Sequence, residues 1–136
     1  MPRTSPVAVV LDAVVDALTV ASGITGVASV YQHVPQNTAY PYLEVTCHTD
    51  RREDALGQLG VSLLVDVKAV SQYRGESQAA DLISAAIGAL SGQSLSVSGH
   101  TVFGVAWEHA ERFKEVVNGI VTRHHVATFR IWTGQA

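Results

Sequence analysis

Histidines offer this sequence its widest choice of chemistry, because an imidazole can ligate a metal ion or exchange a proton near neutral pH. The six are His33, His48, His100, His109, His124 and His125. His124 and His125 are neighbours in a strand-like segment, so their side chains point to opposite faces and cannot readily chelate one ion. No pair has the i, i+4 spacing of a helical zinc site, and none accompanies a Cys-x-x-Cys. We interpret them as strand histidines at polar or interface positions, and we predict no metal or other cofactor.

Two pairs of carboxylates could share acid–base work. Asp12 and Asp16 lie one turn apart on the exposed side of a predicted helix, where a solvated face is expected. Glu53 and Asp54 follow two arginines that would neutralise them. A catalytic acid needs an environment that shifts its pKa, and an exposed, charged segment does not provide one.

Nucleophile and phosphate motifs are also missing from the sequence. Cys47 alternates with Leu43 and Val45 on the apolar side of a predicted strand, which indicates a small buried hydrophobic residue. The sequence has no Gly-x-Ser-x-Gly elbow, Walker loop or dinucleotide fingerprint. Catalysis is therefore not predicted.

Two segments have the apolar spacing of amphipathic helices. The first is predicted from Pro6 to Ala21, since Ser5 can cap it and proline is favoured at the first helical position. Gly23 supplies its stop. The second begins in Arg74–Ser77 and ends at Ser91–Gly92.

The remaining segments alternate or are rich in β-branched residues, as strands are. They are predicted at Gly26–Val34, Tyr40–His48, Val61–Val70, Leu95–Val97, Val102–Val117 and Ile120–Trp132. Asn118-Gly119 is a strong hairpin signal, because a type I′ turn needs positive φ at both central residues. The charged stretch Asp50–Gly60 is predicted to be a long hairpin loop, mobile in the free protein.

This order of elements, α-β-β-β-α-β-β-β, predicts a single α+β domain over residues 1–136. We expect two amphipathic helices packed on one face of an antiparallel sheet. The other face has mixed character and is where a partner would dock.

Composition narrows the classes of partner. The net charge is −3, the pI is near 6.0, and the nine Lys and Arg are scattered, which argues against tight nucleic-acid binding. A single cysteine excludes an intrachain disulfide and favours a reducing compartment. The N-terminus lacks a signal-peptide cleavage pattern, and no stretch is apolar enough to span a membrane. We expect a soluble protein made in the cytoplasm.

Several segments, taken in order along the chain, resemble the tail-terminator (tail completion) proteins of long-tailed phages. They are Val30-Tyr31, Tyr40–Val45, Tyr73–Glu76 and Arg123–Trp132. The resemblance implies a non-enzymatic subunit of a ring, typically of six copies, in the virion tail or neck. Such a ring caps the tail tube, halts its polymerisation and joins it to the head connector or stopper protein. DNA would pass through the ring without specific binding.

Two hairpins are the candidate partner-binding segments, because one is charged and the other is long. The candidate residues are Arg51, Arg52, Glu53, Asp54, Lys114, Asn118, Gly119 and Arg123. We expect the Asp50–Gly60 loop to order on contact with the tail tube or with a neighbouring subunit.

Three alternatives remain open at the level of sequence. The first is another head–tail joining protein of the neck, which would dock to a different ring. The second is a small-molecule-binding or enzymatic α+β domain, which would need a pocket with convergent polar groups. The third is a bacterial interaction module unrelated to phage.

Overall fold

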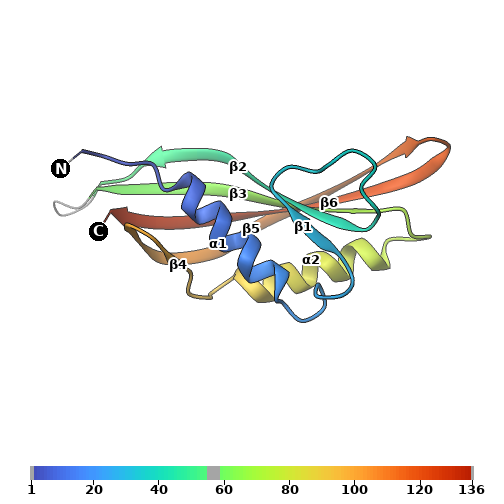
Figure 1. Ribbon diagram of the computed structural model, residues 1–136, viewed down its shortest axis with the longest axis horizontal. Helices are drawn as coiled ribbons and strands as arrows, with labels where there is room; N and C mark the ends of the chain where they lie inside the picture. Colours follow the sequence, from blue (N-terminus) through green and yellow to red (C-terminus); the bar gives the residue numbers. More distant parts are fainter. Residues whose placement is uncertain (1, 55–58, 136) are drawn as a thin grey trace.

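One six-stranded sheet and two helices make up the structure, a computed structural model that describes residues 2–54 and 59–135 (Figure 1). The helices are α1 (Val7–Thr19) and α2 (Ser77–Leu90). The strands are β1 (Ser29–Tyr31), β2 (Tyr42–Arg52), β3 (Gly60–Ser71), β4 (Ser96–Val97), β5 (His100–Val117) and β6 (Ile120–Gln135). The α+β class and the order of elements are as predicted.

The strand order is β1-β2-β3-β6-β5-β4. Every neighbouring pair is antiparallel except β1 and β2, which run parallel. The expectation of a wholly antiparallel sheet was therefore wrong at this edge. The connection through residues 32–41 carries the chain back along the sheet before β2 begins, so both strands point the same way.

Alternate strand residues and one stripe of each helix form the hydrophobic core. Val10, Val14 and Leu18 recur every four residues along α1, so they share its buried face. On the strands, Val67 pairs with Val45 on one side and with Ala127 on the other, and all three are buried. We call the side of the sheet that bears these residues the core face and the opposite side the second face.

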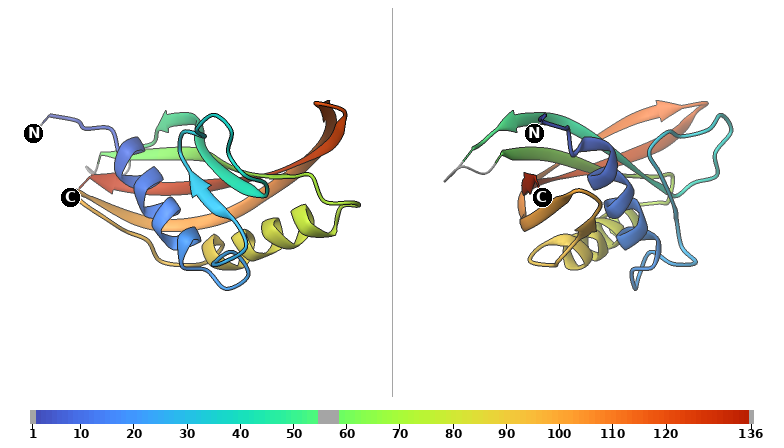
Figure 2. Two further views of the ribbon diagram at one scale, coloured as in Figure 1. Left: turned by 45° about the vertical axis from the view of Figure 1, so that its right-hand side comes forward. Right: turned by 60° about the vertical axis from the view of Figure 1, so that its left-hand side comes forward.

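The helices contact different strands. α1 contacts β1, β2 and β4, while α2 contacts β3, β5 and β6, and the two helices contact each other (Figure 2). Buried residues of both helices belong to the same cluster as the core-face residues of the strands.

Several predicted bounds were wrong where turns interrupt the pattern. The first strand covers Ser29–Tyr31 rather than Gly26–Val34, because turns occupy residues 22–27 and Gly26 has a φ of 78°. The first helix ends at Thr19, two residues before the predicted end.

The charged stretch Asp50–Gly60 is only partly a loop. β2 continues through Arg52 and β3 begins at Gly60, with Asp50 paired with Leu63 and Arg52 paired with Val61. The side chains from His48 to Arg52 are exposed, so their charges cost little while the backbone pairs normally. The predicted mobility concerns the loop that includes residues 55–58, which lie outside the described residues.

The final hairpin is longer than any other element. Asn118 and Gly119 have φ values of 52° and 80°, which confirms the predicted turn chemistry. β3 accompanies β6 only as far as the pair Ser71 and Arg123. The hairpin therefore extends past the rest of the sheet, at the right of Figure 1.

Candidate assembly surfaces

Neither a metal site nor a membrane-spanning helix is found among the described residues. Within residues 2–54 and 59–135, no three His, Cys, Asp or Glu side chains are grouped so that they could hold a metal ion. No helix in this part of the chain is both long and apolar enough to cross a membrane. The Cys47 thiol is half-buried, and burial, aided by the charge of Asp50, raises its pKa. A raised pKa makes the thiol less reactive.

His124 and His125 lie on opposite faces of β6, as the alternation predicts. On the second face, the His124 ring stacks on Phe113 with centroids 4.5 Å apart, and its Nε2 lies 2.7 Å from the Glu115 carboxylate. On the core face, His125 is buried with its Nε2 3.8 Å from Glu76. Burial lowers the pKa of His125, against the opposing effect of the Glu76 charge. His124 therefore joins the two strands of the final hairpin, whereas His125 lies against Glu76 outside it.

The end of the sheet where β2 meets β3 is held by the N-terminal segment. The Arg3 guanidinium donates to both Asp54 carboxylate oxygens at 2.8 Å. The backbone N–H of Gly60 donates to the same carboxylate at 3.0 Å, and Arg52 Nε does so at 2.7 Å. These donors, led by Arg3, hold the pKa of Asp54 far below its usual range. We call this region, residues 2–4, 51–54, 59–61 and 132–135, the strap end.

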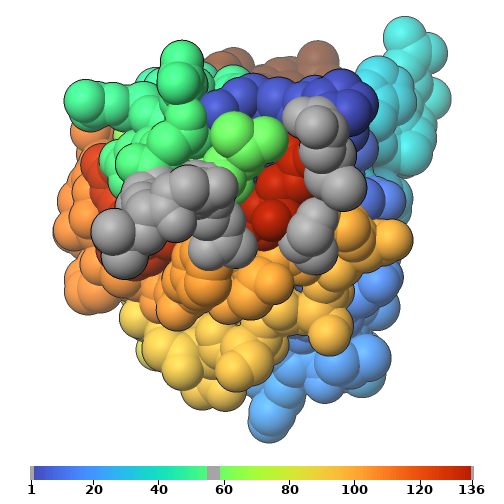
Figure 3. Space-filling view, turned by 90° about the vertical axis from the view of Figure 1, so that its left-hand side faces the viewer, coloured from blue at the N-terminus to red at the C-terminus, as the bar shows by residue number. Residues whose placement is uncertain are grey.

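Gln135 and Gly60 complete the strap end. The Gln135 side chain accepts a hydrogen bond from the backbone N–H of Thr4 and donates one to the Pro2 carbonyl, at 3.0 and 2.8 Å. A Cβ on Gly60 would lie 2.0 Å from the Glu53 carbonyl oxygen, so only glycine fits there. Figure 3 views this end and shows the N-terminal segment beside the ends of β2, β3 and β6.

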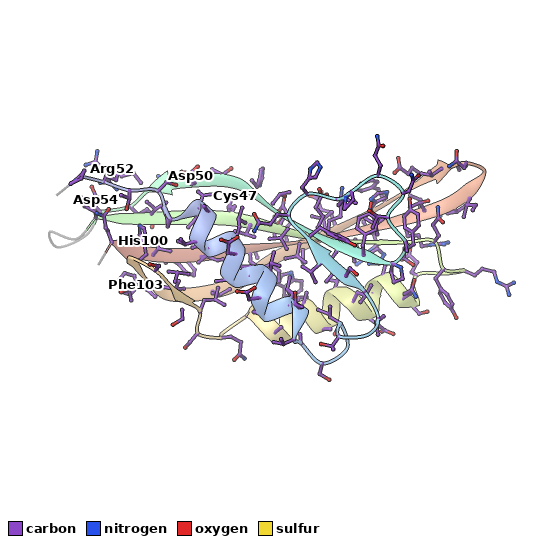
Figure 4. All side chains as sticks on the ribbon, viewed as in Figure 1. Cys47, Asp50, Arg52, Asp54, His100 and Phe103 are labelled. Atoms are coloured by element: carbon purple, nitrogen blue, oxygen red, sulfur yellow. The ribbon has the colours of Figure 1, made fainter. Side chains whose placement is uncertain are left out.

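A hollow of about 270 Å³ opens beside the strap end. Its lining includes Glu53, Phe103 and Trp132. Figure 4 shows Arg52, Asp54, His100 and Phe103 gathered at this end of the molecule. The hollow has few polar groups directed into it, so it resembles a contact surface more than a catalytic pocket.

The opposite end of the sheet is the tip of the β5–β6 hairpin, residues 111–125, which we call the arm. Large apolar side chains are exposed along it. Their exposed fractions are 52% for Phe113, 69% for Val116, 49% for Ile120 and 42% for Val121. Exposed apolar clusters of this kind mark contact surfaces in soluble proteins.

The structure separates the predicted partner-binding residues into two groups that do not meet. Arg51, Arg52, Glu53 and Asp54 lie at the strap end, whereas Lys114, Asn118, Gly119 and Arg123 lie on the arm. Within the first group, Asp54 and Arg52 are engaged by contacts inside the chain, which leaves Arg51 and Glu53 directed outward. In the second, Arg123 donates to the Tyr73 carbonyl at 3.2 Å and lies 3.8 Å from Glu76.

Sequence reasoning missed two sets of residues. Arg3 and Gln135 were overlooked because their partners are 51 or more positions away in the chain. The exposed apolar residues of the arm left a readable signal. Both alternating sets of residues 111–121 contain charges and large apolar side chains, which is atypical of a strand with one buried face.

Comparison with solved structures finds this fold in a virus-like particle. A chain in the structure titled "Virion of native gene transfer agent (GTA) particle" has a TM-score of 0.76 and 19% sequence identity. The alignment covers 96% of this protein and 99% of that chain. No curated protein matches this sequence. At this identity the likeness establishes the fold alone.

The family comparison is more specific. Residues 10–134 match the family described as tail completion protein gp17, and the chain belongs to that family. It is therefore a structural protein of the phage tail, as the sequence resemblance implied.

Proposed function

We propose that this protein is the subunit of a ring, of about six copies, that caps the tail tube, stops its polymerisation and joins it to the head connector. The observation that carries the proposal is the pair of unlike edges of the sheet. β1 accompanies β2 only along residues 42–44, and β4 accompanies β5 only along residues 100–101. Long stretches of both β2 and β5 thus lack a neighbouring strand on their outer side among the described residues.

Unlike edges suit a ring because a cyclic assembly joins one surface of each subunit to a different surface of the next. Exposed strand edges present unpaired N–H and C=O groups that favour association. Besides β4, the segment after α2 contacts the β5 edge: Gly92 N–H donates to the Val105 carbonyl at 2.8 Å, and Trp107 N–H donates to Ser91 Oγ at 3.4 Å.

The positions of the exposed surfaces on the protein support its proposed location in the virus particle. In this proposal both helices cover the core face of the sheet. The second face, the strap end and the arm are then available to bind the tail tube, the head connector and the neighbouring subunits. A net charge of −3 per subunit disfavours a grip on DNA phosphate, so DNA can pass without specific binding. The structurally similar chain comes from a virion, which supports the same location here.

Deletion of the gene, followed by electron microscopy of the particles, tests the role. Loss of a terminator should give overlong tails, because tube growth no longer stops. Tails of normal length separated from their heads would instead indicate a joining protein. Tails of normal length attached to heads would contradict both roles.

Substitution tests the contribution of the strap end without removing any part of β2, which includes Arg51 and Arg52. We expect Arg51→Gln with Glu53→Gln to keep the fold and to weaken capping, because both side chains are directed outward. Asp81→Asn, an exposed change on α2, is the control. Normal tail lengths in the double variant would show that the strap end does not contact the tail tube.

A further inference from the structure

The arm departs from the rest of the sheet because it exposes large apolar side chains on both of its faces. Lys114 pairs with Arg123, and beyond this pair the hairpin is two-stranded, with no third strand along its edge among the described residues. Val116 is 69% exposed on one face, and Ile120 is 49% exposed on the other. A two-stranded ribbon with apolar residues on both sides is marginal in water unless something packs against it.

Pairing along the hairpin shows that the two faces carry opposite charge. The face continuous with the core face is cationic, and its exposed residues are Arg112, Lys114, Val116 and Val121, with the half-buried Arg123 beside them. The other is anionic and aromatic. Its exposed or half-buried residues are Glu111, Phe113, Glu115, Val117 and Ile120, and Thr122 and His124 on the same face are buried. Each face therefore combines charges of one sign with apolar side chains.

The charges are available for contacts outside the chain. Within residues 2–54 and 59–135, Arg112, Lys114 and Glu111 make no ion pair. Glu115 contacts His124 at 2.7 Å, but its side chain remains 53% exposed. Arg123 is the member of the cationic face with a carboxylate nearby, Glu76 at 3.8 Å.

We propose that the arms of neighbouring copies stack on one another, with the cationic face of one arm against the anionic face of the next. This inference rests on the proposed ring and names one of its subunit contacts. Around a rotation axis, equivalent ribbons meet by opposite faces, so those faces must be complementary rather than alike. A two-fold dimer would require a face that matches itself, and like charges on each arm face oppose that.

Charge reversal tests the stack on the purified full chain. Lys114→Glu places an anion on the cationic face beside Arg112 and Arg123, and Glu111→Lys places a cation on the anionic face beside Glu115. The double variant, Lys114→Glu with Glu111→Lys, exchanges the two charges and restores complementarity. Asp16→Lys, and Gln93→Glu with Ser94→Asp, make the same changes in net charge at exposed positions away from the arm and are the matched controls.

Sedimentation velocity over a concentration series provides the measurement. We expect wild type and both controls to assemble, and each single arm variant to need about tenfold more protein or to stay monomeric. The double variant should recover most of the loss. Unchanged circular dichroism and melting temperature would show that the single variants remain folded.

The possible failures have different meanings. A ring that forms equally well with Lys114→Glu overturns the arm contact and leaves the proposed ring intact. A double variant no better than the single variants also overturns the stack. Wild-type protein that stays monomeric at every concentration overturns self-association through the arm. The terminator role is tested separately, by the tail lengths in the deletion strain.

Discussion

The strap end and the arm are the two extremities of one sheet, and they differ in how their charges are satisfied. At the strap end, Asp54 receives hydrogen bonds from Arg3, Arg52 and Gly60. On the arm, Lys114 and Glu111 are exposed. Charges paired within the chain hold the fold, whereas charges left at the surface are available to a partner. Charge density in the sequence therefore indicates a surface without indicating which of these roles it has.

Gly60→Ala should have the largest effect on stability. Its new Cβ would clash with the Glu53 backbone, so the start of β3 must move, and we expect a loss of about 3 kcal/mol. Gly119→Ala on the arm, where φ is 80° but nothing lies near the new Cβ, should cost only about 1–2 kcal/mol. Urea unfolding of both variants measures the difference, and equal losses would contradict it.

Asp54→Asn should loosen the strap end without unfolding the protein. The amide keeps the shape of the side chain but loses the charge that Arg3 and Arg52 bind. Amide hydrogen exchange at Glu53 and Gly60 should become faster, while exchange in the β3–β6 core stays unchanged. Glu53→Gln is the control, and slow exchange in both variants would show that the ion pairs do not hold this end.

Acid should release the strap end in wild-type protein. Because the folded-state pKa of Asp54 is lowered from 3.8, its contribution is complete above that pH and is lost as the pH falls below about 4. An NMR titration of the Asp54 carboxyl checks this directly. A midpoint at the ordinary value would contradict it.

His125 should make stability depend on pH at the base of the arm. Its folded-state pKa is lowered from 6.5, so the unfolded chain binds more protons below that pH and stability falls as the solution is acidified. His125→Gln should flatten the decline below about pH 6.5. Unfolding curves measured across this pH range check the prediction. If the slope of stability against pH is the same in the variant as in wild type, His125 is not responsible for the decline.

Val116→Ser should have the smallest effect on stability, within about 0.5 kcal/mol, because the side chain is 69% exposed. Assembly should nevertheless weaken, since the stacked arms would bury this residue. Val67→Ser in the core is the contrasting variant and should destabilise the monomer itself. A Val116→Ser protein that assembles as wild type would limit the arm contact to its charges.

Much of the fold could be predicted from local pattern. The spacing of Val10, Val14 and Leu18 predicted α1, and Asn118-Gly119 predicted the turn whose φ values are both positive. Bounds were less well predicted in the charged stretch, because exposed charges are compatible with either a loop or an exposed strand end. The candidate site was predicted as two hairpins, but the division of roles between them could not be predicted.

The sequence by itself determined the elements, their order and the family to which the chain belongs, because periodicity and turn chemistry act over a few residues. Tertiary structure decided which charges are engaged. Arg3 reaches Asp54 across 51 positions, and no local rule connects them. It also decided that β3 stops beside Arg123 while the hairpin continues. The exposure of the arm follows from that difference in strand length, which depends on pairing between distant segments.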